Sequence, residues 1–155
     1  MKKLIHNITV TVFEQDEETI ENHKQIFQDL LPVDFKKEKV NSSIETVEGF
    51  NHKTIYILRL KTEKKRHNET LLNTIFANLS EMDKKRISDQ MLTRINLEGY
   101  FFIRLKKDKM LANKFELTEG GDCYHFKIKL AGFPAKWQNF VKSAKSILIK
   151  NKCPI

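Results

Sequence analysis

The sequence predicts an α+β domain of two layers, in which a mainly antiparallel sheet carries helices packed on one face. Two kinds of periodicity support this prediction. Segments in which apolar and polar residues alternate are typical of half-buried strands, and segments with apolar residues three or four positions apart are typical of amphipathic helices. Along the chain these segments follow the order β-α-β-β-α-α-β-β-β-α. This order favours helices gathered on one face of an antiparallel sheet.

The first part of the chain contains one strand and one helix. Residues 4–13 form the predicted strand, because apolar residues alternate there with polar ones: Ile8, Val10 and Val12 on one face, and Asn7, Thr9 and Thr11 on the other. Asp16 is a suitable N-cap for the next helix, because its carboxylate can accept a hydrogen bond from an unpaired backbone N–H. Pro32 ends this helix, because proline has no N–H to donate.

The middle of the chain is expected to hold two strands and two helices. The strands and their turn are a strand over 44–47, a turn over 48–51 and a strand over 53–61. A helix with an apolar stripe from Leu71 to Leu79 follows. Ser80 and Asp83 then have the spacing of a capping box, in which the serine oxygen accepts the third residue's N–H and the acid reaches back. We expect the helix that starts there to continue through Ile95.

The last part of the chain contains three strands and one helix. The expected strands cover 99–106, 114–117 and 123–131, and the helix starts near Pro134. Gly120 and Gly121 lie between the last two strands and indicate a two-residue hairpin, because a type I′ turn needs positive φ at both central positions. The flanking Glu119 and Asp122 would repel a phosphate, so we favour a hairpin over an anion-binding loop.

Length and composition predict a basic cytoplasmic protein with one domain, residues 1–155. Lys and Arg number 28 against 20 Asp and Glu, which gives a net charge of +8 and favours a polyanionic partner. Basic clusters at 64–66, 84–86, 106–109 and 136–152 strengthen this expectation. The N-terminus alternates like a strand rather than a signal peptide, and no apolar run has the length of a membrane span, so we expect no membrane contact.

No set of residues argues for catalysis, a metal or another cofactor. The five histidines lack the spacing of a zinc-hydrolase helix, and glycine-rich phosphate motifs are absent. Cys123 and Cys153 form no CxxC pair, so a disulfide framework or a cysteine-rich zinc site is not expected. Cys123 and His125 share a strand face and could form half a metal site or a nucleophile pair. A small enzyme that uses this pair is the weakest of the alternatives.

The faces of three strands suggest a site for RNA. Cations and aromatic rings share the predicted polar face, where they could contact phosphates and stack on unpaired bases. Lys136, from the lysine-rich last 20 residues, is added as a further phosphate contact. The candidate RNA-binding residues are Arg59, Lys61, Tyr100, Phe102, Arg104, Lys106, Lys127, Lys129 and Lys136. Two other interpretations remain open: lysines that serve only solubility, and a protein-interaction module that forms a homodimer through its sheet.

Several segments resemble one archaeal family, the predicted exosome-subunit or RNA-binding proteins of unassigned activity. The segments are HNITVTVFEQDEE (6–18), LLPVDF (30–35), YFFIRLKKDK (100–109) and FELTEGGDCYHFKIKLAGFPAK (115–136). The resemblance implies an α+β fold like that of the ribosomal protein that binds 5S RNA. It also implies a non-catalytic role in RNA binding, as an accessory to an RNA-processing complex or to ribosome-related assembly. No binding residues come with it.

Overall fold

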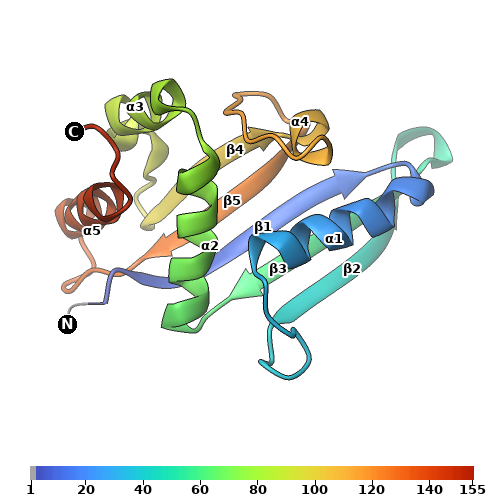
Figure 1. Cartoon of the computed structure of the whole chain (residues 1–155), viewed down its shortest axis with the longest axis horizontal. Coiled ribbons are helices and arrows are strands. Elements are labelled where there is room, and N and C mark those ends of the chain that lie inside the picture. The colour runs from blue at the N-terminus through green and yellow to red at the C-terminus, as the bar shows by residue number, and fades with distance from the viewer. Residues whose placement is uncertain (1–2) are drawn as a thin grey trace.

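The computed structural model describes residues 3–155, and within them five strands form one antiparallel sheet in the order β2-β3-β1-β5-β4 (Figure 1). The strands are β1 Ile5–Glu14, β2 Asn41–Glu48, β3 Thr54–Thr62, β4 Tyr100–Lys106 and β5 Cys123–Leu130. The α-helices are α1 Ile20–Leu30, α2 Lys65–Asn78, α3 Glu81–Asp89, α4 Lys107–Leu111 and α5 Trp137–Lys150. The short 3-10 helices are η1 Glu17–Thr19, η2 Phe50–His52 and η3 Met91–Arg94.

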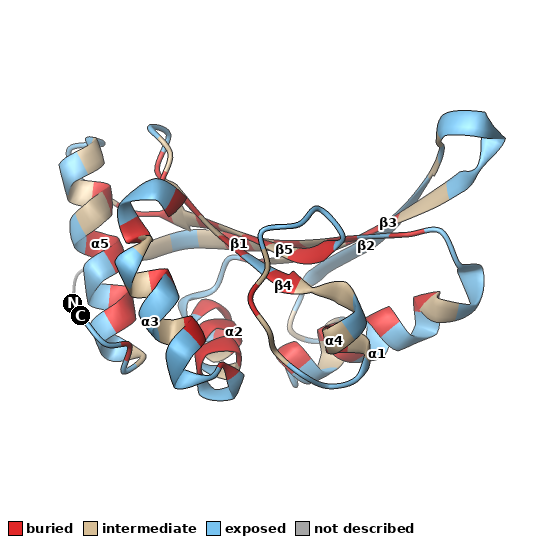
Figure 2. Cartoon of the chain, turned by 90° about the horizontal axis from the view of Figure 1, so that it is seen from above, coloured by how far each residue is buried: buried red, intermediate tan, exposed pale blue. Residues whose placement is uncertain are grey.

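Helices α1 to α4 gather on one side of the sheet and α5 lies at one end of it, so that the other side is largely uncovered (Figure 2). Successive side chains of a strand point to opposite faces, so one residue in two contributes to the core. The buried set on the helix side includes Ile8, Val10 and Val12 of β1, Leu58 and Leu60 of β3, Phe101, Ile103 and Leu105 of β4, and Tyr124, Phe126, Ile128 and Leu130 of β5. The two-layer α+β architecture and the predicted faces of β1, β4 and β5 are therefore confirmed.

A buried polar network joins α1 to the sheet. His23 on α1 and Tyr124 on β5 are both fully buried, and the Tyr124 hydroxyl is hydrogen bonded to Nδ1 of His23. Nε2 of His23 lies 2.6 Å from Oε1 of Glu14, at the end of β1. Burial raises the pKa of the Tyr124 hydroxyl, so the phenol stays protonated and neutral in the core. This network satisfies polar groups that would otherwise be stranded among apolar side chains.

The start of α3 agrees only partly with its prediction. Ser80 Oγ accepts the backbone N–H of Asp83 at 3.1 Å, as an N-cap should. The Asp83 carboxylate does not complete a capping box but accepts the backbone N–H of Leu117 at 3.0 Å. The prediction of a single helix through Ile95 is wrong, because α3 ends at Asp89 and a short 3-10 helix follows. The change of direction lets Ile95 form a bridge with Phe101 at the start of β4.

The predicted hairpin around Gly120 and Gly121 is wrong. Residues 114–117 do not pair with β5 but run along the outer edge of β4, where the N–H of Lys106 donates to the carbonyl of Glu116 at 2.9 Å. Neither glycine has the positive φ that a type I′ turn requires. The connection 119–122 instead leads from the outer edge of β4 to β5 on the inner edge. Alternation along a strand shows which residues share a face but not which strand lies beside it. The sequence pattern therefore gave the wrong pairing for residues 114–117.

Candidate nucleic-acid interface

The sheet surface away from the helices, called the open face below, combines cations with aromatic rings. Strand register sets its layout: Lys127 of β5 lies opposite Thr9 of β1 and Phe102 of β4, and Lys129 lies opposite Tyr100. The open face is defined by Thr9, Thr11, Arg59, Lys61, Tyr100, Phe102, Arg104, Lys106, His125, Lys127 and Lys129. All of the strand residues predicted for RNA binding fall within it. Lys136 does not, because it lies in the connection 131–136 that leads to α5.

Tyr100 holds two ammonium groups against its ring. Nζ of Lys127 lies 4.1 Å from the ring centroid and Nζ of Lys129 lies 4.7 Å from it. These are cation–π distances, at which the negative face of the ring attracts the charge. Lys129 also donates a hydrogen bond to the carbonyl oxygen of Glu98 and lies 5.6 Å from the ring of Phe140. Two like charges are thus held close together by groups that carry no full negative charge.

Phe102 extends this aromatic surface towards His125. Its ring centroid lies 6.3 Å from that of Tyr100, with 30° between the planes, and 5.5 Å from the imidazole of His125. Burial lowers the pKa of His125, and the charges of Arg104 and Lys127 lower it further. The imidazole is therefore mainly neutral at pH 7. The sequence placed His125 on this face through strand alternation, but the cross-strand contact with Phe102 was not evident from it.

The cations of the open face are not equally available. Arg59 pairs with Glu45 at 2.9 Å and Lys106 with Glu116 at 2.8 Å, and the Glu116 carboxylate raises the pKa of Lys106. In the part of the chain that the structure describes, no carboxylate lies within 4.0 Å of Lys127, Lys129 or Arg104. Arg104 donates instead to the carbonyl of Glu119 at 3.2 Å. The uncompensated positive charge therefore concentrates on β4 and β5.

The open face is also concave. Figure 2 shows the sheet rising on the side away from the helices at both ends, at the β2–β3 connection and near the start of α5. At the end of β4, Asp122 pairs with Lys107 at 2.8 Å, which anchors the connection 119–122. The side of the sheet that carries these cations and aromatic rings is therefore its concave side, which is called the trough below.

The alternative pair Cys123 and His125 has little of what a catalytic centre needs. Burial raises the pKa of the Cys123 thiol, although Arg104 opposes this effect, and a protonated thiol is a poor nucleophile. Over residues 3–155, no hydrogen bond joins the thiol to His125, and no group of three His, Cys, Asp or Glu side chains is arranged to hold a metal ion. Over the same residues no helix has both the length and the apolar character needed to span a membrane.

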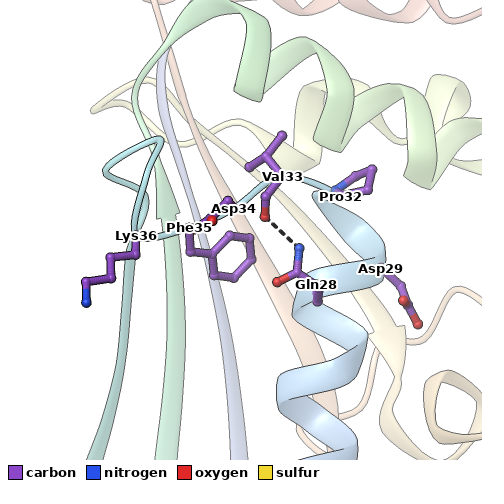
Figure 3. Close-up of a pocket in the computed structure, with 7 residues that line it drawn as sticks. All are labelled: Gln28, Asp29, Pro32, Val33, Asp34, Phe35 and Lys36. Atoms are coloured by element: carbon purple, nitrogen blue, oxygen red, sulfur yellow. Dashed lines mark hydrogen bonds between the residues drawn. The ribbon is translucent and has the colours of Figure 1, made fainter.

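A shallow hollow lies elsewhere and offers no reactive group. It has a volume of about 640 Å³ beside the end of α1, and Figure 3 shows its lining side chains. Gln28 donates to the carbonyl of Val33 at 2.6 Å (Figure 3). Asp29 accepts from Gln25 at 2.9 Å, and Asp34 accepts the backbone N–H of Lys37 at 3.0 Å. Its polar groups therefore serve local structure.

The open face of this two-layer α+β protein is basic, aromatic and concave, which suits a polyanionic partner. Comparisons with known proteins point to the same class of partner. A family model described as RNA binding matches residues 7–130, and the chain belongs to this RNA-binding family. An RNA-binding protein of Pyrococcus abyssi is 25% identical over 143 residues, which cover 92% of this chain and 93% of that protein.

Solved structures of archaeal proteins share the fold. A DUF54 protein from Methanothermobacter thermautotrophicus is similar with a TM-score of 0.74 and 25% identity, over 94% of this chain and 99% of that one. A protein from Archaeoglobus fulgidus of the same family is similar with a TM-score of 0.77 and 20% identity, over 92% of this chain and 99% of that one. The second likeness concerns the fold alone.

Proposed function

We propose that this protein is a non-catalytic RNA-binding protein and that RNA binds on its open face. The observation that carries the proposal is the pair Lys127 and Lys129, held on the ring of Tyr100 without a carboxylate partner. Family membership and the RNA-binding name of the Pyrococcus relative support it. The proposal includes the nine RNA-contacting residues expected from the sequence. Lys127, Lys129 and Arg104 would make the central contacts.

The chemistry of binding would be mainly electrostatic. An ammonium group that has no carboxylate partner can contact a phosphate without first breaking an ion pair, and it releases counterions from the RNA as it does so. Tyr100 would act by positioning Lys127 and Lys129, since its ring already contacts both ammonium groups. Arg59 and Lys106 would contribute less, because each must first leave a glutamate.

The test is a titration of labelled RNA at several salt concentrations. We expect the double variant Lys127→Gln/Lys129→Gln to bind less tightly and to reduce the magnitude of the slope of log K against log salt by about 1.4 to 1.8, since each phosphate contact contributes about 0.7 to 0.9. The matched control is Lys65→Gln/Lys85→Gln, which removes the same charge from α2 and α3 in the helix layer. Absence of RNA binding by the unmodified protein at low salt would overturn the proposal.

The proposal extends to a cytoplasmic accessory role in RNA processing or ribosome-related assembly. The resemblance to predicted exosome subunits, and to the fold of the 5S-RNA-binding ribosomal protein, supports this extension. Sequencing of RNA cross-linked to the protein in cells tests it: precursors of stable RNA are expected, and an unselective sample of transcripts would count against it.

A further inference from the structure

The connection 131–136 presents an aromatic ring that no part of the fold uses. Phe133 is 93% exposed, although a phenylalanine gains stability when it is buried. The connection lies at the end of the sheet at which α5 begins (Figure 1). We propose that Phe133 stacks on the base of an unpaired nucleotide whose neighbouring phosphates bind Lys129 and Lys136. This inference rests on the proposed function and names the form of RNA that the open face selects.

The rings on the floor of the trough are less suited to stacking. Tyr100 has two ammonium groups within 4.7 Å of its centroid. Phe102 has rings on two sides, Tyr100 at 6.3 Å and His125 at 5.5 Å between centroids. These neighbours compete with a base for contact with either ring. Phe133 has open faces and requires no displacement.

Phe140 connects Phe133 to the lysines of the open face. The residue before Phe133 is Gly132, which packs so closely on Phe140 that an added Cβ would lie 3.1 Å from its ring. The same ring also lies near Lys129, whose Nζ is 5.6 Å from the ring centroid. Gly99 (φ 90°) also packs on Phe140, where an added Cβ would lie 2.8 Å from the ring. The ring of Phe140 therefore lies next to both Lys129 and Gly132, the residue that precedes Phe133.

The connection is held in place by hydrogen bonds that do not involve the Phe133 side chain. Asn139 donates from its side chain to the carbonyl of Pro134 at 2.7 Å, and the N–H of Lys136 donates to the same oxygen at 2.8 Å. The N–H of Ala131 donates to the carbonyl of Leu4 at 2.8 Å. Because the backbone is already fixed, stacking on Phe133 would cost little additional conformational entropy.

The charges around Phe133 suit a phosphate chain. Lys136 is exposed, and among residues 3–155 it has no carboxylate within 4.0 Å. Lys129 lies 5.6 Å from the ring centroid of Phe140, and among the described residues it has no carboxylate partner either. A base stacked on the ring would leave its flanking phosphates near one or both lysines. Bases inside a duplex are covered by their neighbours, so this arrangement selects unpaired nucleotides.

The experiment measures binding of the full chain to a single-stranded RNA that carries 2-aminopurine, and to a duplex of the same sequence. Phe133→Ala should weaken binding of the single strand by about 5- to 150-fold and abolish fluorescence quenching on binding. The salt slope should stay unchanged, since no charge is removed. Phe133→Tyr should retain binding. Duplex affinity should be the same for Phe133→Ala and the unmodified protein.

The matched control is Phe50→Ala. Phe50 is 89% exposed but lies in the β2–β3 connection, away from Lys129, so single-strand affinity should not change. If Phe133→Ala binds the single strand as tightly as the unmodified protein, with the salt slope intact, this inference is overturned while the proposed function stands. That result would also be expected if Phe133 docked a protein. If the unmodified protein binds no RNA, the proposed function itself fails.

Discussion

At the scale of single residues, Tyr100 explains how Lys127 and Lys129 can lie close together. Their mutual repulsion is offset by the face of the ring and, for Lys129, by the carbonyl of Glu98. Neither group neutralises the charge, so both lysines keep their full attraction for an anion. His125 lies at the other end of the aromatic surface and is the one histidine among the residues that define the open face.

We predict that RNA affinity rises as the pH falls, through His125. Burial, Arg104 and Lys127 hold the pKa of His125 below its ordinary value of 6.5 in the free protein. Phosphates on the open face would favour the imidazolium, so the pKa rises on binding and the complex takes up a proton. Affinity measured from about pH 7.5 to pH 5.5 should therefore increase towards acid. His125→Gln should flatten the profile, while His52→Gln, in the β2–β3 connection, should not. A profile unchanged by His125→Gln contradicts the prediction.

At the scale of elements, one buried arginine fixes the end of the trough. Arg94 of η3 donates to the carbonyl of Phe102 in β4 at 3.3 Å and to the Gln90 side chain at 2.6 Å. It also lies 3.3 Å from the carboxylate of Glu119. Because Arg104 holds the carbonyl of the same glutamate, the connection 119–122 is tied to both η3 and β4. The glycines of this connection therefore sit in a fixed crossing rather than in a hairpin turn.

Ion pairs between Glu38 and α2 contribute to the stability of the fold. Glu38, in the turn between α1 and β2, lies 2.6 Å from Arg66 and 3.0 Å from His67 of α2. Hydrogen bonds from these two residues lower the pKa of Glu38 from 4.5 to about 2. A lowered pKa stabilises the fold above the unfolded value and loses this effect as the pH falls through the folded value. Glu38→Gln should therefore reduce the free energy of unfolding at pH 7, and the difference should vanish as the pH approaches about 2.

Urea denaturation at several pH values measures this effect. The control is Glu17→Gln, because Glu17 is exposed and has no ion-pair partner among residues 3–155. An equal loss for Glu38→Gln at pH 7 and at pH 3 would show that the carboxylate charge does not matter.

Local sequence was enough for the faces of the strands but not for their neighbours. Alternation assigned Lys127, Lys129, Tyr100 and Arg104 to one side, because side chains along a strand have a strict period of two. It could not show that Tyr100 lies opposite Lys129, since that depends on the order of strands in the sheet. The same limitation led residues 114–117 to be assigned to a hairpin. Pairing partners are chosen by packing across the whole chain, which a short pattern does not contain.

At the scale of the whole molecule, the positive charge is compensated unevenly. In the helix layer Lys85 pairs with Asp89 at 3.0 Å and Lys65 lies 3.9 Å from Glu69. On the open face Lys127 and Lys129 have no such partners among the described residues. Part of the net charge of +8 therefore lies without carboxylate partners on the open face, where it attracts anions.

Amine-reactive labelling with mass spectrometry should show which side binds. With RNA present, labelling of Lys127 and Lys129 should fall, while labelling of Lys65 and Lys85 should stay constant. A homodimer through the sheet would instead protect Lys127 and Lys129 without RNA, in a manner that depends on protein concentration. Protection of Lys65 and Lys85 alone would place the RNA on the helix layer and contradict the proposal.

The position of β5 within the sheet determines when the sheet can be completed during synthesis. β5 is the last strand to be synthesised, yet it lies between β1 and β4, with Ile8 opposite Ile128 and Ile103 opposite Phe126. Until β5 emerges from the ribosome, β1 has one bare edge and β4 has no place in the sheet. Contacts between distant parts of a chain form slowly, because a long loop must close first. In the nascent protein β4 therefore stays separate from β1 until β5 is available. The trough forms only after translation of nearly the whole chain.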